Sequence, residues 1–152
     1  MRSWLAILVI LVIVPASAYG GKFEITENLE PAPVEIKQIM IRNYPSYSNC
    51  IIAGKYFDLD GDGEFADYIA TVQGCGNSGN DSILVFKNEI NSYVEVLRYG
   101  GYALTTDNNI NGGLNNITIL AGADDGRTLI TLWVYNGKFY VKKRGRVLEI
   151  IK

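Results

Sequence analysis

The clearest fold signal in this sequence is the stretch Leu132-Trp133-Val134-Tyr135-Asn136-Gly137-Lys138-Phe139-Tyr140-Val141. Aromatic and β-branched residues flank the central Asn-Gly pair, and such residues are typical of β-strands. Asn-Gly suits a two-residue type I′ turn because both central positions of that turn need a positive φ. The stretch therefore predicts an antiparallel hairpin of two strands, 132–135 and 138–141.

Short apolar runs separated by Gly, Asn and Asp continue on both sides of this hairpin, from Cys50 onward. The segment 100–115 is rich in Gly and Asn, which is typical of a long mobile surface loop. The predicted fold class is mainly β, an antiparallel sheet of about seven or eight short strands with one short N-terminal helix. The first strand of the hairpin is expected to begin at 127 and to span 127–135. The other predicted strands are 50–57, 67–73, 82–87, 93–99, 116–121 and 147–151.

The single helix is expected just before the first of these strands. Apolar residues recur at helical spacing from Val34 to Met40, after Pro33, which suits the first turn of a helix. Pro45 ends the pattern and begins a connecting loop. The mature chain thus divides into an N-terminal segment with the helix, 19–46, and an antiparallel β domain with the acidic loop, 47–152.

Residues 1–18 have the pattern of a cleavable signal peptide. Arg2 supplies a positive charge, residues 4–14 form an unbroken apolar run, and Ala16-Ser17-Ala18 matches the small-x-small motif of signal peptidase sites. The run spans about 11 residues, whereas a membrane-spanning helix needs about 20. We therefore expect cleavage after Ala18, a periplasmic or secreted location, and no stable membrane anchor afterwards. An uncleaved anchor is the alternative.

Charge is distributed unevenly along the chain. Without Arg2, 13 basic residues face 16 acidic ones, a balance of −3 that is too small to indicate nucleic acid or a membrane surface as partner. A solvated edge strand is the usual reason for a basic cluster, and a binding patch is the alternative. The cluster near the C-terminal end of this sequence contains Lys138, Lys142, Lys143, Arg144 and Arg146.

Cys50 and Cys75 are the two cysteines of the chain, and the sequence has no His. In an oxidising compartment such a pair usually forms a disulfide, here closing a loop of about 25 residues and worth roughly 3 kcal/mol. Two free thiols are the alternative. Without His, Ser-His-Asp and Cys-His catalysis and the common zinc-hydrolase ligand sets are excluded. A carboxylate-based hydrolase stays open, with Glu95, Asp107 and Asp124 as candidate acids.

The acidic stretch between the first two predicted strands carries the most specific chemistry. Asp58, Asp60 and Asp62 alternate, and Gly63 permits a sharp bend that turns their carboxylates toward one centre. The backbone carbonyl of Glu64 is a natural further ligand, and like charges this close need a counter-ion. Calcium accepts six to eight oxygen ligands at flexible angles, so the stretch predicts a structural Ca²⁺ site. An acidic, Gly-rich turn that binds nothing is the alternative.

The stretch from Tyr56 to Gly63, followed by Asp67-Tyr68-Ile69-Ala70, resembles the FG-GAP/VCBS-type calcium loop of integrin-like propellers. That loop reads D-x-D-x-D-G-x-x-D and continues into an apolar strand, so the resemblance implies a calcium loop between strands. The last acid, Asp67, falls one residue later than the pattern, where Ala66 stands, which leaves its role as a ligand open. Small exported bacterial proteins of unassigned role carry a single such loop, and they often end in an aromatic-Asn-Gly-Lys-aromatic hairpin.

Several aromatic residues lie on or beside the predicted strands. Tyr99, Tyr102, Trp133 and Tyr135 are candidates for a binding surface, since Tyr and Trp are enriched at interfaces; the filling of a β core is the alternative. We expect an exported, calcium-binding, disulfide-stabilised, non-enzymatic domain that binds a protein or glycan. The alternatives are a periplasmic inhibitor or immunity protein against a cell-wall hydrolase, and the carboxylate-based hydrolase.

Overall fold

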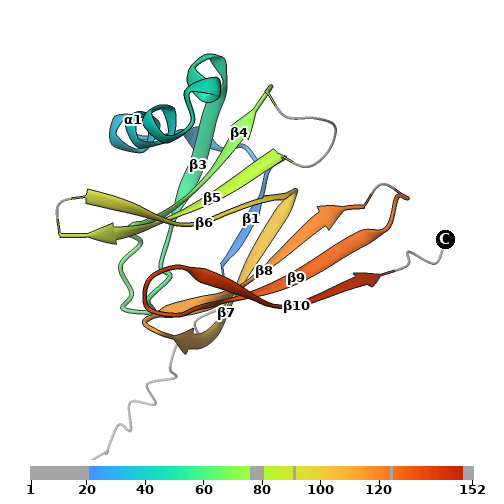
Figure 1. Cartoon of the computed structure of the whole chain (residues 1–152). Helices are drawn as coiled ribbons and strands as arrows, with labels where there is room; N and C mark the ends of the chain where they lie inside the picture. Colours follow the sequence, from blue (N-terminus) through green and yellow to red (C-terminus); the bar gives the residue numbers. More distant parts are fainter. Residues whose placement is uncertain (1–20, 76–80, 91, 124, 149–152) are drawn as a thin grey trace, which may run out of the picture.

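The computed structural model describes residues 21–75, 81–90, 92–123 and 125–148 (Figure 1). These residues form two five-stranded antiparallel sheets and one α-helix. Sheet A has the order β1 (Lys22–Glu24), β7 (Ala103–Asn111), β8 (Leu114–Gly122), β9 (Thr128–Tyr135) and β10 (Tyr140–Leu148). Sheet B has the order β2 (Glu30–Pro31), β3 (Ile51–Phe57), β4 (Asp67–Gln73), β5 (Asp81–Glu89) and β6 (Ser92–Gly101).

The helix α1 (Val34–Asn43), sheet B and sheet A form three stacked layers (Figure 1). Ile36 and Met40 of α1 pack on Tyr68 and Leu84 of sheet B, and this helix-side core keeps one face of sheet B dry. A second core lies between the two sheets and contains large apolar side chains of both: Phe57, Leu59, Ile69, Val85, Leu104, Ile117 and Ile119. Sheet B is therefore buried on both faces, whereas sheet A contacts a core with only one of its faces.

The prediction of a mainly antiparallel β fold with one short N-terminal helix is confirmed. The described residues form ten strands, more than the seven or eight predicted. Two additional strands are β1, which pairs with β7, and β2, which pairs with β3. They have three and two residues, too few to show a periodic pattern in the sequence. The connection after α1, predicted as a loop, is a short 3₁₀ helix, η1 (Pro45–Asn49).

The prediction of a mobile loop at 100–115 is wrong, because these residues complete β6, form β7 and begin β8, which pairs with β7 as a hairpin. Leu104 is buried in the inter-sheet core and pairs with Ile119 across the hairpin. The hairpin turns at Gly112 and Gly113, whose φ angles are +61° and +105°. The Gly content of this segment therefore reflects a tight turn that needs positive φ, as such turns do in hairpins.

The hairpin of β9 and β10 is antiparallel as predicted, but its turn is not the two-residue turn expected from Asn136-Gly137. Tyr135 pairs with Tyr140, so four residues separate the strands. The side-chain oxygen of Asn136 accepts hydrogen bonds from the amides of Lys138 and Phe139, both at 3.0 Å, which closes the longer turn.

The separate last strand predicted for 147–151 is also wrong, because β10 continues without interruption to Leu148. The remaining residues of that prediction, 149–151, lie outside the described part of the chain, as do the predicted signal peptide and its cleavage point. No helix among the described residues is long and apolar enough to cross a membrane.

Candidate metal centre

The acidic loop connects β3 to β4 in sheet B, and its backbone is built for a tight turn. Phe57 and Asp67 pair at the ends of the two strands. Gly61 and Gly63 have φ angles of +76° and +91°, a region that L residues with side chains rarely adopt. Leu59 is fully buried in the inter-sheet core. The buried Leu59 therefore anchors the loop near its start, while the side chains of Asp60 and Asp62 stay at the surface.

The carboxylates of Asp58, Asp60 and Asp62 lie together, as the sequence predicts. One carboxylate oxygen from each residue lies within 4.8 Å of the others, an arrangement that could hold a metal ion. Asp58 is half-buried, and Asp60 and Asp62 are exposed. Three carboxylates supply only oxygen donors, which are the ligands that hard divalent cations prefer. The residues present thus fit a hard cation and do not fit a soft one.

Backbone amides of the same loop fix the orientation of the three carboxylates. Asp58 accepts hydrogen bonds from the amides of Gly61 at 2.7 Å and Gly63 at 3.0 Å. Asp60 accepts one from the amide of Asp62 at 3.3 Å, and Asp62 accepts one from Glu64 at 2.7 Å. A carboxylate oxygen has two lone pairs, so these bonds leave acceptor capacity for a cation.

Glu64 and Asp67, the other two predicted ligands, are placed differently from the three carboxylates. The carbonyl of Glu64 accepts a hydrogen bond from the amide of Ala66 at 3.0 Å, which uses one of its two lone pairs. Asp67 is 5% exposed and is not a member of the three-residue group. Its two oxygens accept hydrogen bonds from the buried amide of Leu59 at 3.0 Å and from the amide of Asn88 at 2.8 Å. Asp67 thus connects the start of β4 to the loop through the amide of Leu59, and we call this connection a brace.

Sheet A supplies a second brace that the sequence did not reveal. The amide of Asn115 on β8 donates to the carbonyl of Leu59 at 2.6 Å. The hydroxyl of Tyr140, at the start of β10, donates to the carbonyl of Asn115 at 2.7 Å. Asn88, Asn115 and Tyr140 are far from the loop in sequence, and no sequence pattern connects them to it, so only the fold could show their part in the site.

Electrostatics show that the loop concentrates negative charge. Partial burial raises the pKa of Asp60, and the charges of Asp62 and Asp58 add to this rise. Burial also raises the pKa of Asp67; its two amide hydrogen bonds oppose the rise, and the charges of Asp60 and Asp58 reinforce it. A pocket of about 220 Å³ opens beside the loop. The residues that line it are Asp60, Asp62, Glu64, Ala66, Asp67, Asn88, Glu89 and Ile90.

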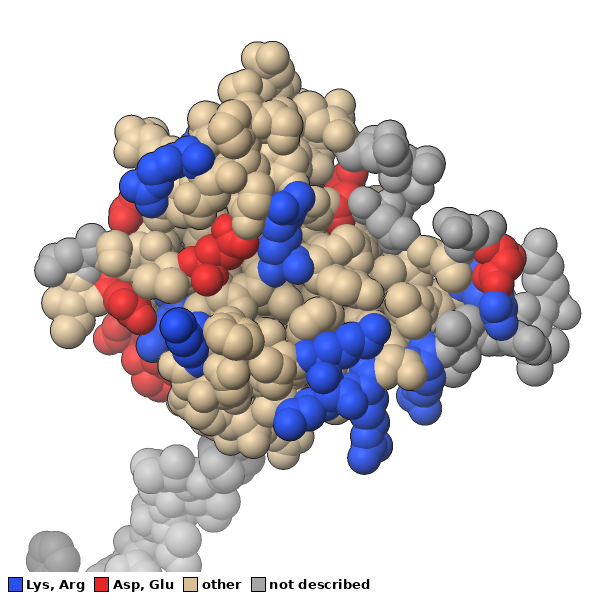
Figure 2. Space-filling view, viewed as in Figure 1, with Lys and Arg blue, Asp and Glu red and all other residues tan. Residues whose placement is uncertain are grey.

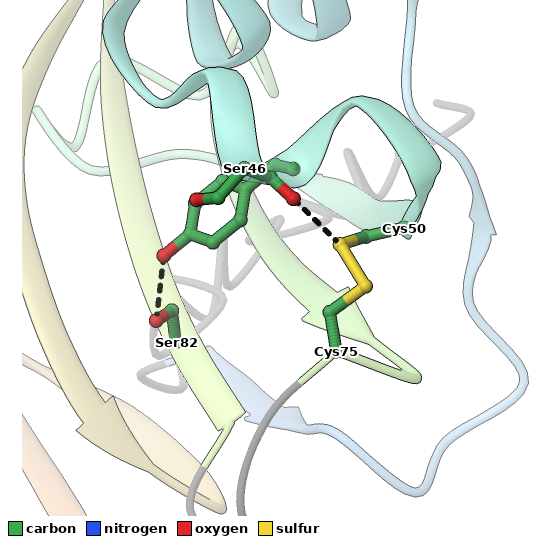
Figure 3. The surroundings of a disulfide bond; sticks show 5 residues. Ser46, Cys50, Cys75 and Ser82 are labelled. Atoms are coloured by element: carbon green, nitrogen blue, oxygen red, sulfur yellow. Dashed lines mark hydrogen bonds between the residues drawn. A yellow bond between two sulfur atoms is a disulfide. The ribbon is translucent and has the colours of Figure 1, made fainter.

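The predicted disulfide between Cys50 and Cys75 is confirmed (Figure 3). Its Cα atoms are 5.7 Å apart. It joins the residue before β3 to Cys75, two residues after the end of β4, close to the paired residues Ile51 and Gln73. The bond therefore closes the end of the β3–β4 hairpin opposite the acidic loop.

The aromatic residues predicted as a binding surface do not form one surface. Tyr135 is 4% exposed and belongs to the inter-sheet core, so its assignment to a surface is wrong. Tyr99 and Trp133 are half-buried against the same core, with ring centroids 4.9 Å apart. The hydroxyl of Tyr102 lies 3.2 Å from that of Thr128. Tyr99, Trp133 and Tyr135 thus belong to or pack against the core between the sheets, whereas Tyr102 is not among the residues of that core.

The candidate acids of a hydrolase are separated by the fold. Glu95 lies on β6 in sheet B and accepts a hydrogen bond from the hydroxyl of Tyr44 at 2.6 Å. Asp107 lies on β7 in sheet A and accepts hydrogen bonds from the amide of Asn109 and the side chain of Asn116. Asp124 lies outside the described residues. The structure thus places the two described candidates on different sheets.

Comparisons with protein-family models, with curated proteins and with solved structures gave no match to this chain. The resemblance of the acidic loop to the FG-GAP/VCBS type therefore stays a prediction, and the function rests on the geometry described above.

Proposed function

We propose that this chain is an exported, non-enzymatic binding domain whose acidic loop holds a structural calcium ion. The observation that carries the proposal is the group of three aspartates, with carboxylate oxygens within 4.8 Å of one another and oriented by the amides of their own loop. Hydrogen bonds from amides hold these side chains in place, but they do not remove the repulsion between three negative charges. A bound cation does.

Calcium fits this loop better than magnesium does. The three carboxylates lie at or near the surface, with a pocket beside them that leaves room for water ligands. Magnesium requires a near-octahedral ligand set at short distances, whereas calcium accepts more oxygens with looser geometry. The sequence resemblance to the FG-GAP/VCBS type implies a calcium loop between two strands, and this loop lies between β3 and β4.

The proposed role of the ion is structural. The loop is hydrogen-bonded to Asp67 on β4 and to Asn115 on β8, so a rigid loop ties together the ends of both sheets. An ion that binds the folded loop stabilises the folded state by mass action, by about 2.7 kcal/mol at a concentration 100 times its Kd.

Export is supported by two independent features. The signal-peptide pattern of residues 1–18 directs a chain out of the cytoplasm. The disulfide between Cys50 and Cys75 suits an oxidising compartment, where such bonds form and persist. Calcium is also more available outside cells, where weak sites suffice.

A thermal melt of the mature chain with calcium and with chelator tests the metal site. We expect Tm to rise with calcium and to fall with chelator, because the ion binds the folded loop and not the unfolded chain. Asp60→Ala should abolish this response, since it removes one carboxylate of the three. An unchanged wild-type Tm under both conditions would rule out the site.

Asp125→Ala is the matched control for Asp60→Ala. Asp125 is another exposed acid, but it pairs with Arg127 near the start of β9, away from the loop. The control should keep the full calcium response. Loss of the response in both variants would show that calcium acts through general charge screening and not through the loop.

A further inference from the structure

The strand β10 forms one edge of sheet A and lines a groove on the face of that sheet turned away from the core. The groove has a volume of about 660 Å³. No other described element covers it: α1 lies on the far side of sheet B (Figure 1). The residues that line it are Thr118, Ile130, Leu132, Lys143, Arg144, Gly145 and Arg146.

A β-bulge gathers the basic side chains of β10 on this groove. Lys142 pairs with Trp133 and Arg144 pairs with Leu132, so Lys143 is the extra residue. Regular alternation along a strand would send Lys143 and Arg144 to opposite faces of the sheet. A bulge changes that alternation and re-aims side chains. As a result Lys143, Arg144 and Arg146 all line the same groove.

These three cations are not neutralised within the described part of the chain. Lys22, Lys55, Lys87 and Arg127 each form an ion pair with a nearby carboxylate. None of the three groove cations has such a partner among the residues that the structure describes. Figure 2 shows blue side chains gathered over β10 with no red side chain among them. The groove therefore presents uncompensated positive charge to an incoming ligand.

The floor of the groove is aliphatic. Ile130 and Leu132 on β9 are half-buried, and Thr118 on β8 lies beside them, whereas the three cations are exposed. A ligand that covers these apolar side chains removes their surface from water, which favours binding. The groove thus combines an aliphatic floor with a basic wall.

We propose that this groove binds an extended acidic segment of a partner protein, in which carboxylates face the basic wall and aliphatic side chains cover the floor. The inference deepens the proposed function, because it names a partner class for a domain proposed to act by binding. It depends on β9 and β10 and not on the calcium loop. Arg and Lys side chains bind carboxylates through charge-assisted hydrogen bonds, and two arginines give these bonds defined geometry.

Other occupants fit the groove less well. Nucleic-acid bases and sugar rings are commonly stacked on aromatic side chains, and no aromatic residue lines the groove. A bilayer would meet the exposed cations and leave the half-buried floor uncovered. Strand addition by a second copy is opposed by the bulge and the lysines, which protect edges from pairing. A small amphiphile would remain largely in water in so open a groove. An extended peptide can contact the basic wall and the aliphatic floor along its whole length, and so avoids these difficulties.

Fluorescence anisotropy with three labelled octapeptides tests the proposal on the mature chain. One peptide alternates Glu and Leu, the second replaces each Glu by Gln, and the third replaces each Leu by Ser. We expect measurable binding only of the Glu-Leu peptide, because the groove offers both charge and apolar contact. Equal binding of the Glu-Ser peptide would show that the aliphatic floor does not contribute and would overturn the proposal in its present form. If none of the three peptides binds, the proposed site is wrong.

Charge reversal then locates the binding on the protein. Arg144→Glu and Arg146→Glu should each weaken binding of the Glu-Leu peptide roughly tenfold, since each exchanges attraction for repulsion. Arg42→Glu, on the exposed side of α1, is the matched control and should leave the affinity unchanged. Equal losses in all three variants would indicate non-specific charge attraction and would overturn the proposal. These exposed substitutions should leave Tm nearly unchanged, so a lost affinity is not a lost fold.

Two further arms distinguish the other occupants. Binding to phosphatidylglycerol vesicles or to heparin, without binding of the Glu-Leu peptide, would overturn a peptide partner in favour of a membrane or a polyanionic glycan. Sedimentation of the chain as a dimer that Arg144→Glu dissociates would assign the groove to a second copy and would also overturn it. The peptide assay is run in chelator as well as calcium. Peptide binding that persists without a calcium response would leave this proposal standing while the proposed metal site fails.

Discussion

Sheet B and sheet A have the same number of strands, but sheet B is covered on both faces and sheet A on one. In sheet B, six consecutive residues of β4, from Asp67 to Val72, are buried, because α1 covers one face and sheet A the other. In sheet A, β9 has two buried residues, Thr131 and Tyr135, and the others are half-buried. A strand inside the protein can hold a loop rigidly, whereas a strand with one uncovered face can offer a surface to a partner.

The two candidate sites follow this division. The acidic loop connects two strands of the doubly covered sheet and is anchored by the buried Leu59. The basic groove lies on the uncovered face and edge of the other sheet. A hydrogen-bonded connection joins the two regions, since Tyr140 of β10 bonds to Asn115, which bonds to Leu59 of the loop. The proposed metal site and the proposed partner site therefore lie in different sheets of one fold, connected by these hydrogen bonds.

Truncation of one leucine in each sheet should show the largest difference. Leu84 on β5 is fully buried beneath α1, so Leu84→Ala should lower the free energy of unfolding by about 2–5 kcal/mol. Leu132 on β9 is half-buried in the groove floor, so Leu132→Ala should cost less than about 1 kcal/mol, because it leaves no enclosed cavity. Urea unfolding measures both. Equal losses would show that the outer face of sheet A is covered in solution.

Asp67→Asn tests how firmly the loop is attached to sheet B. The two oxygens of Asp67 accept hydrogen bonds from two backbone amides, and Asn offers one acceptor oxygen and one donor group. One of the two amides, that of Leu59 or that of Asn88, therefore loses its hydrogen-bond acceptor. We expect the free energy of unfolding, measured in chelator, to fall by about 1–3 kcal/mol. Urea unfolding is the measurement. The control Glu89→Gln, on the exposed neighbour of Asn88, should change the free energy of unfolding by less than about 0.5 kcal/mol. Equal stability of Asp67→Asn and wild type would remove Asp67 as a brace.

Sequence patterns predicted those parts of the fold whose causes are local. The predicted bounds of β4, 67–73, match the structure, because the acidic loop and the Gly-rich segment mark the two ends of a short alternating stretch. The disulfide followed from compartment and cysteine number, and the three aspartates from their spacing. Each of these inferences uses residues close together in the sequence or a pair with no competing partner.

The parts that sequence did not predict depend on distant contacts. The segment 100–115 contains many Gly and Asn residues, and only its pairing with β8 and β1 makes it a strand and a tight turn. The bulge at Lys143 that re-aims the basic side chains has no local signature either. The brace of Asn115 and Tyr140 under the loop arises because the two sheets stack, which no motif in the chain encodes.

The smallest expected effect is the dependence of the calcium response on pH. In chelator, the raised pKa values of Asp67 and Asp60 mean that the folded state keeps protons at a pH where the unfolded chain has lost them. Their contribution to the free energy of unfolding therefore rises as pH falls through these raised pKa values, and it is complete below about 3.9, the ordinary Asp value. Calcium needs ionised carboxylates, so its contribution changes in the opposite direction and decreases as protons compete.

We therefore expect the difference in Tm between calcium and chelator to shrink as pH falls from neutral toward the ordinary pKa of Asp, about 3.9. Taking the difference cancels groups remote from the loop, such as Asp125, whose pKa is lowered by its hydrogen bond to Arg127. The guanidinium groups of the groove stay charged, and the Glu side chains of the peptide stay ionised well above their ordinary pKa of about 4.3. Binding of the Glu-Leu peptide should therefore change little between neutral pH and about pH 5.5. A difference in Tm that stays constant down to about pH 3.9, the ordinary pKa of Asp, would show that protons and calcium do not compete at the loop. A decline of peptide binding already above about pH 5.5, in parallel with the calcium response, would show that the loop and the groove act as one site and not as two.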